Sequence, residues 1–195
     1  MRRFLIALGI VIALLAGGGA YLLSRGFSAR ETPSGLEAAL ARRLRHLATP
    51  RGARAAKNPL PATPEVLADS LAHFADHCAV CHANDGSGQT TLGQGTYPKA
   101  PDMRLPETQR LSDGELFYII ENGVRFTAMP AWGIPGPEDD ADTWGLVHFI
   151  RHLPQLTAGE LERMRALNPK TAEEWQAEQF LAGEEAPAAE STHPH

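Results

Sequence analysis

The sequence predicts an all-α fold, and two observations carry that prediction. Apolar residues recur at intervals of three and four along much of the chain, which is the period of a helix that buries one face. Three Ser or Thr residues that are each followed three positions later by Glu also predict capping boxes at helix starts. These pairs are Ser112–Glu115, Thr157–Glu160 and Thr171–Glu174.

An uncharged run from Phe4 to Leu23 predicts a membrane anchor over residues 1–27. As a helix the run extends about 30 Å, which matches the hydrocarbon core of a bilayer. Arg2 and Arg3 precede it, which favours a cytoplasmic N-terminus and export of the rest. A signal peptide cleaved after small residues 18–20 is the alternative. We favour retention because the apolar run continues beyond that point. No cysteine lies near the N-terminus, which excludes a lipid anchor there.

Residues 28–63 predict a basic linker with a short amphipathic helix. Ser34 can cap a helix that reaches Leu47, and four leucines share one of its faces. Prolines and small residues then indicate linker. Residues 24–60 hold eight Lys/Arg against two Glu, a net charge of +6, while residues 61–195 carry −13. The basic segment indicates contact with anionic lipid or a solvated charge run. Neither suggests nucleic acid.

Residues 64–156 predict a compact helical domain. Thr63 can cap a first helix that starts at Pro64 and leads to the only two cysteines. A Gly/Thr/Pro-rich loop follows, and Ser112 then opens a second helix that ends near Asn122-Gly123. A third helix begins within Asp139–Asp142 and stops at Pro154. Its expected buried residues are Trp144, Val147 and Ile150, with Phe149 as a further candidate.

The chain beyond this domain predicts a helical extension over residues 157–182 and a disordered tail over residues 183–195. The extension holds two short capped helices that can pack back on the domain or bind a partner. Their apolar residues are Leu161, Met164, Leu167, Trp175 and Phe180. The tail is rich in Ala, Glu and Pro, a composition that cannot bury a core.

The sequence Cys78-Ala79-Val80-Cys81-His82 is the attachment motif for c-type haem. Two thiols add to the two vinyl groups of one porphyrin, and the next histidine binds the iron. A thioredoxin-like dithiol would require a βαβ pattern, and a zinc site would require about four ligands. A disulfide across two residues would close a small, strained loop. The motif therefore favours one covalent haem c on Cys78 and Cys81, with His82 as an iron ligand.

A methionine opposite the histidine would stabilise ferrous iron, because a thioether is a soft ligand. Met103 and Met129 both lie in predicted loops, whereas Met164 falls in a helical repeat and is expected in the core. A second histidine is a further alternative. Three histidine pairs are also candidate metal ligands: His73 with His77, His148 with His152, and His193 with His195. Surface positions, or a solvated tail for the last pair, are favoured because no third ligand is nearby.

Three segments, His73–Gly88, Thr127–Gly133 and Trp144–Pro154, resemble a class I cytochrome c domain. The resemblance implies an all-α fold wrapped around one covalent haem, with Met129 as the iron ligand opposite His82. It also implies that the carbonyl of Pro101 accepts a hydrogen bond from the His82 ring.

Three further residues, Tyr97, Arg125 and Trp132, are candidates for contact with the haem edge or propionates. Packed core residues would give the same pattern in the sequence.

Iron held by protein on both sides predicts an electron carrier rather than an enzyme, with no small-molecule substrate. The expected partners are membrane-bound or periplasmic redox proteins. The expected place is the inner membrane, crossed once, with the haem domain facing the periplasm. Three alternatives stay open: a cytochrome subunit of a larger oxidoreductase complex, a haem enzyme or sensor with an open distal site, and a dithiol oxidoreductase without haem.

Overall fold

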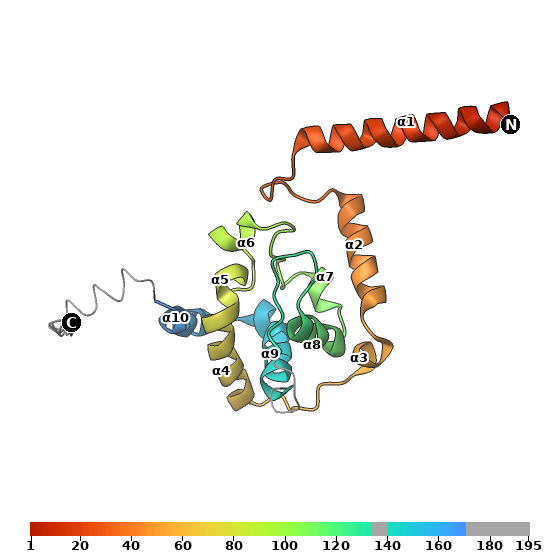
Figure 1. Ribbon diagram of the computed structural model, residues 1–195. Helices are drawn as coiled ribbons and strands as arrows, with labels where there is room; N and C mark the ends of the chain where they lie inside the picture. Colours follow the sequence, from red (N-terminus) through yellow and green to blue (C-terminus); the bar gives the residue numbers. More distant parts are fainter. Residues whose placement is uncertain (134–139, 171–195) are drawn as a thin grey trace, which may run out of the picture.

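The computed structural model describes residues 1–133 and 140–170, and its regular structure there is entirely helical (Figure 1). This confirms the all-α prediction. Helix α1 stands apart from a globular body, α2 and α3 lie along one side of that body, and α10 lies on the other. The elements are α1 Arg2–Arg25, α2 Gly35–Ala48, α3 Arg51–Ala55, α4 Pro64–His73, η1 Phe74–Cys78, α5 Ala79–His82, α6 Thr91–Gly95, α7 Pro106–Gln109, α8 Asp113–Asn122, α9 Asp140–His152, η2 Leu153–Gln155 and α10 Ala158–Leu167.

Helix α1 is long and apolar enough to cross a membrane. Its 24 residues correspond to about 36 Å of helix, slightly more than a hydrocarbon core. Its large apolar side chains are exposed on all sides, with Leu14 at 70% and Leu15 at 71%. A helix that is apolar all round and does not pack on the protein requires an apolar surrounding.

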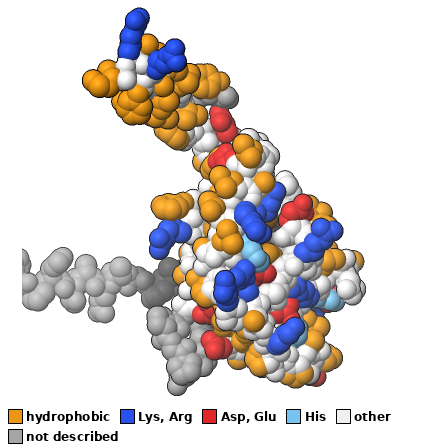
Figure 2. Space-filling model, turned by 90° about the vertical axis from the view of Figure 1, so that its right-hand side faces the viewer, with side chains coloured by type: hydrophobic (Ala, Val, Ile, Leu, Met, Phe, Trp, Pro, Cys, Tyr) orange, Lys and Arg blue, Asp and Glu red, His pale blue; other side chains and the backbone are white. Residues whose placement is uncertain are grey.

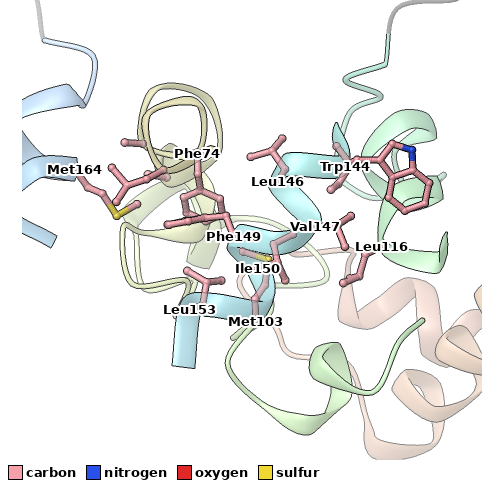
Figure 3. Close-up of a cluster of buried hydrophobic side chains, with 14 residues drawn as sticks. Phe74, Met103, Leu116, Trp144, Leu146, Val147, Phe149, Ile150, Leu153 and Met164 are labelled. Carbon is pink, nitrogen blue, oxygen red and sulfur yellow. The ribbon is translucent and has the colours of Figure 1, made fainter. Parts of the chain in front are cut away.

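The core of the body forms where α4 and η1 cross α9 (Figure 3). The rings of Phe74 and Phe149 lie 5.0 Å apart between centroids, and both side chains are fully buried. Trp144, Val147 and Ile150 are buried on the same helix, as predicted. Met164 of α10 is also fully buried, which confirms its expected core position.

The predicted helix starts are confirmed at the atomic level. The Thr63 hydroxyl accepts the Val66 backbone N–H at 3.3 Å, and Pro64 is the first residue of α4. Ser112 with Glu115 forms the capping box of α8, and Thr157 with Glu160 forms that of α10. The third box at residues 171–174, with Trp175, Phe180, the tail and its two histidines, lies outside the described residues.

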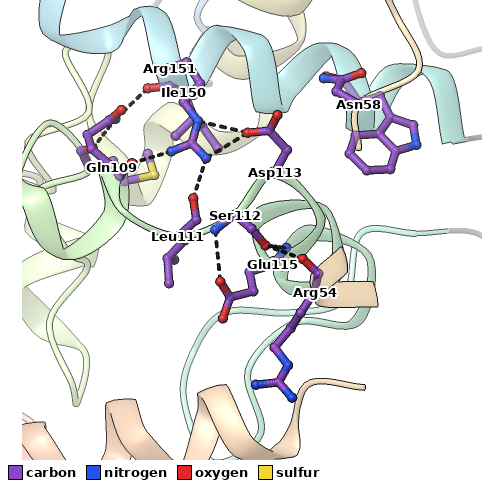
Figure 4. Close-up of polar contacts among 11 residues, drawn as sticks. Arg54, Asn58, Gln109, Leu111, Ser112, Asp113, Glu115, Ile150 and Arg151 are labelled. Carbon is purple, nitrogen blue, oxygen red and sulfur yellow. Dashed lines mark hydrogen bonds and ion pairs between the residues drawn. The ribbon is translucent and has the colours of Figure 1, made fainter. Parts of the chain in front are cut away.

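Arg151 of α9 forms hydrogen bonds with residues 109–113, the segment that leads into α8 (Figure 4). Its guanidinium donates to the Asp113 carboxylate at 2.8 Å and to the backbone carbonyls of Gln109 and Leu111. The Gln109 side chain in turn donates to the carbonyls of Met103 and Ile150 at 2.7 and 2.8 Å. Backbone groups that have no helical partner are thus paired by side chains, as a buried turn requires.

The segment expected to be linker before α4 packs against the body instead. It contains α3, and the Ser112 hydroxyl donates to the Arg54 carbonyl at 2.8 Å. The Asn58 amide donates to the carbonyl of Trp144 at 2.8 Å. Gly114 of α8 permits this close packing, because a Cβ atom there would collide with the Ala53 carbonyl of α3.

His148 and His152, expected on the helix surface, are partly buried and bind different groups. His148 Nε2 lies 2.8 Å from the Leu60 carbonyl, and His152 Nε2 lies 2.8 Å from the Glu160 carboxylate. Both rings therefore join α9 to neighbouring segments, which explains why they do not act as a pair.

Helix α2 is joined to α8 through a buried carboxylate. His46 Nδ1 lies 2.6 Å from Glu115 Oε1, and Arg54 Nη1 lies 2.8 Å from His46 Nε2. Arginine only donates, so Nε2 must accept and the proton on Nδ1 is donated to Glu115. Burial raises the pKa of Glu115, but hydrogen bonds from Ser112 and His46 outweigh it, and the net pKa is lowered.

We expect Glu115→Ala to lower the free energy of unfolding by about 1–3 kcal/mol, because it removes the cap of α8 and the partner of His46. Urea denaturation of the full chain in detergent measures the change. Glu162→Ala is the control: its carboxylate is exposed and pairs only with Arg165, so the loss should stay below about 0.5 kcal/mol. Equal losses in both variants would contradict the buried joint.

The effect of Glu115→Ala should also depend on pH. The folded-state pKa of Glu115 is lowered, so its stabilisation is complete above the pKa of the unfolded chain. It fades as the pH falls through the folded-state value. The difference between wild type and variant should therefore shrink in acid, and denaturation series at neutral and acidic pH would show a gap that widens if the sign is wrong.

Candidate haem site

The two cysteines and His82 lie at the end of a helix that changes its winding. Helix α4 continues directly into the π-helical turn η1. The amide of Ala79, the residue after this turn, donates to the Phe74 carbonyl. The wider turn adds one residue and rotates the next turn of the helix. Ala75 and Ala79 are consequently buried, while Cys78 and Cys81 stay partly exposed as free thiols.

Neither thiol has the environment of a reactive dithiol. Burial, followed by the neighbouring Cys81, raises the pKa of Cys78 to about 12. Burial also raises the pKa of Cys81. Catalytic dithiols need a lowered pKa, because the thiolate is the nucleophile. Both cysteines are thus kept as neutral thiols side by side on one helix end.

His82 has the environment of a metal ligand. Its Nδ1 atom is buried and has no hydrogen-bond partner. Burial lowers the pKa of the ring, and the approaching carbonyl of Pro101 raises it by a smaller amount without completing a hydrogen bond to Nδ1. A neutral imidazole is the form that binds metal, and a nearby carbonyl orients it. The residues present therefore fit a haem c that is attached through two thiols and ligated by His82.

The loop after His82 folds tightly back on the motif. The Gly88 amide donates to the His82 carbonyl at 2.8 Å, and the Thr90 hydroxyl donates to the Cys81 carbonyl at 3.2 Å. Gly93 in α6 lies so close to the Cys81 carbonyl that a Cβ atom there would collide with it. The Ala100 amide donates to the Gly93 carbonyl at 2.9 Å, which brings Pro101 toward His82.

The segment that carries Met129 is held at the end of α8. Gly123 ends this helix with a φ of 64° and leaves no room for a Cβ beside Pro130. The Val124 amide then donates to the Met129 carbonyl at 3.1 Å. Three residues beyond Met129, the Trp132 side chain contacts the His77 ring edge-on, with 5.5 Å between the ring centroids. The Met129 segment therefore lies against the turn that precedes Cys78.

The two loop methionines have different surroundings. Met103 is a core residue with 7% exposure, and its amide donates to the Gly86 carbonyl at 2.8 Å. The Met129 side chain is partly exposed. A side chain already packed in the core is less available as a ligand.

Tyr97 and Arg125 form no hydrogen bond, ion pair or ring contact with the cysteine motif in the part of the chain that the structure describes. The Tyr97 hydroxyl donates to Glu37 of α2 at 2.5 Å, and this contact raises the pKa of Tyr97. Arg125 is exposed and forms no ion pair within the described ranges. Of the remaining candidates, Pro101 lies beside His82, and Trp132 lies beside His77.

The sequence analysis did not predict the hydrogen bonds of Asn168 around the cysteine motif, which we call the Asn168 clamp. Asn168, just after α10, donates to the Ala75 carbonyl at 2.8 Å and exchanges amide hydrogen bonds with Asn84 at 2.7 and 3.0 Å. Asn168 thus binds one residue before the two cysteines, Ala75, and one residue after them, Asn84. The position after a capped helix was its only local signal, because both partners are more than 80 residues away.

We expect Gly93→Ala to prevent normal folding around the cysteine motif, since the new methyl group would meet the Cys81 carbonyl and lie 2.8 Å from that of Gly88. The overpacking should cost about 1–3 kcal/mol or more. Gly95→Ala is the matched control, because nothing lies within 4 Å of a Cβ there. Thermal denaturation compares the two, and equal melting temperatures would contradict the close approach.

The comparison with known families agrees with this geometry. Residues 65–150 match the family model described as "Cytochrome C oxidase, cbb3-type, subunit III". The match begins in α4 and ends in α9, so it spans the cysteine motif, Pro101 and the Met129 segment. Together with the two thiols and the buried imidazole nitrogen, it identifies residues 65–150 as a c-type cytochrome domain, the kind that carries haem c for electron transfer.

Proposed function

We propose that this chain is a membrane-anchored cytochrome c with one haem, which carries single electrons between redox partners on the exported side of the inner membrane. The observation that carries the proposal is the contact of Trp132 with His77. This contact supports the proposal because it brings Trp132, three residues beyond Met129, against His77, the residue before Cys78.

Each residue of the site has a distinct task in this proposal. Cys78 and Cys81 would hold the haem through thioether bonds, and His82 and Met129 would be its iron ligands. When bound, the haem supplies one-electron chemistry through the ferric and ferrous states of its iron. The Pro101 carbonyl orients the His82 ring, and the soft sulfur of Met129 favours the ferrous state.

If His82 and Met129 both bound the iron, no position on it would be left for a substrate, and the chain would act as a carrier rather than an enzyme. The chemistry then requires no acid or base, because only an electron enters and leaves. Redox partner proteins, rather than small molecules, are the expected donors and acceptors.

Helix α1 supports a retained anchor with the cytochrome domain outside. Arg2 and Arg3 stand before its apolar part, which favours a cytoplasmic N-terminus. The tether keeps the haem near membrane redox proteins and raises its effective concentration there.

A second candidate is a role as the cytochrome subunit of a larger oxidoreductase complex. The matched family model is named after a subunit of an oxidase, which favours this role. Native electrophoresis of mildly solubilised membranes with haem staining separates the two. A single carrier migrates near its own 21.1 kDa plus detergent, whereas a subunit migrates with a much larger assembly.

We expect Cys78→Ala with Cys81→Ala to abolish covalent haem, because both attachment atoms are lost. Haem staining of the denatured protein on a gel is the measurement. Gly95→Ala, which leaves the motif intact, should retain the stain. Denatured wild-type protein without stain would refute covalent attachment and revive the dithiol alternative.

We expect Met129→Ala to remove the absorption band of the iron–methionine bond, lower the reduction potential and allow carbon monoxide to bind. Met103→Leu should leave all three properties unchanged, because it replaces one buried apolar side chain with another of similar volume. If the Met103 variant loses the band and the Met129 variant keeps it, the ligand assignment is wrong.

A further inference from the structure

Helix α2 exposes a row of leucines that has no partner on the body. Leu36, Leu40, Leu44 and Leu47 are 82%, 56%, 56% and 59% exposed. They share one face of the helix, and Figure 2 shows hydrophobic and basic side chains interspersed on this side of the molecule below α1. Exposed apolar rows of this kind mark interaction surfaces.

The opposite face of α2 is the one that packs on the body. Thr49, just beyond the helix, is buried, and Arg45 and His46 are half-buried, with His46 bound to Glu115. At about 100° per residue, these positions lie roughly opposite the leucines. The leucine row therefore points away from the body. To bury the leucines against the body, α2 would have to rotate and break the hydrogen bond between His46 and Glu115.

The charges of this helix are mainly basic, and at about 100° per residue Arg43 lies beside the leucines, whereas Arg42 lies on the other side of α2. Arg42 and Arg43 are exposed and form no ion pair within residues 1–133 and 140–170. Glu37, the only acidic residue of α2, is bound by the Tyr97 hydroxyl. The leucine row and the neighbouring Arg43 therefore match a membrane interface, where an apolar interior lies beneath anionic headgroups.

The chain itself keeps α2 near such a surface. Helix α1 ends at Arg25 and α2 begins at Gly35, so only residues 26–34 separate them. Nine residues span at most about 31 Å when fully extended. If α1 crosses a bilayer, α2 cannot leave the vicinity of its surface.

We propose that α2 lies in the headgroup region of the bilayer that α1 spans, with its leucines in the apolar boundary and Arg43 on anionic lipid headgroups. This is the arrangement of an interfacial amphipathic helix. The proposal rests on the anchor part of the proposed function. Because His46 and Glu115 join α2 to α8, the lipid contact would also fix the orientation of the cytochrome domain relative to the membrane.

The test uses the full-length, haem-loaded chain in lipid nanodiscs. A nitroxide on Leu40→Cys reports access to oxygen, which dissolves in lipid, and to a water-soluble nickel complex. In discs with phosphatidylcholine and phosphatidylglycerol at 7:3, we expect nickel access to fall several-fold relative to a label on Glu162→Cys, which is exposed on α10. A Leu40 label as open to nickel as the Glu162 label would overturn the proposal.

Two further arms separate the causes. Arg43→Gln should reduce protection of the Leu40 label in the anionic discs to the level in pure phosphatidylcholine, whose headgroup has no net charge. Equal protection in both lipids, with or without Arg43, would overturn the contact with anionic headgroups. Protection in native membranes but not in discs would assign the surface to a protein partner instead.

The anchor is tested separately in the same preparation. The chain should remain with the discs in 1 M salt, where the Debye length of about 3 Å removes purely electrostatic binding. Loss of the chain under these conditions would refute the anchor itself, whereas retention with an exposed Leu40 label would refute only the interfacial position of α2.

Discussion

The crossing of α4 with α9 is the contact on which both sides of the site depend. Phe74 and Phe149 meet there at 5.0 Å and fix the two helices against each other. Helix α4 delivers the cysteine motif through its π-helical turn. Helix α9 holds the start of α8 through Arg151, and the end of α8 holds the Met129 segment. A weaker crossing would therefore move the cysteine motif away from the Met129 segment.

Helix starts and core faces could be predicted because their signals are local. A Ser or Thr cap acts within three residues, and the period of the apolar residues is a property of one helix. The short helices α3, α6 and α7 could not be predicted in the same way. Helix α6, for example, depends on Gly93 fitting beneath the Cys81 carbonyl, a contact between different segments. The π-helical turn also leaves no distinctive residue pattern.

The same distinction between local and long-range signals holds for the candidate site. The haem attachment motif could be predicted because the bonds to a porphyrin require two thiols at this spacing. The buried nitrogen of His82 agrees with that chemistry. The surroundings were less readable, because they come from distant parts of the chain. Tyr97 reaches Glu37, 60 residues earlier, and Asn168 reaches Asn84, 84 residues earlier. No window of sequence contains both members of such a pair.

The Asn168 clamp has a consequence for the modularity of this domain. The matched family region ends at residue 150, yet the amide that secures Ala75 and Asn84 lies beyond it. On the other side, Asn58 secures the Trp144 carbonyl from before residue 65. A gene fusion that inherited only residues 65–150 would lose these hydrogen bonds. The folded unit in this chain therefore extends beyond the matched region on both sides.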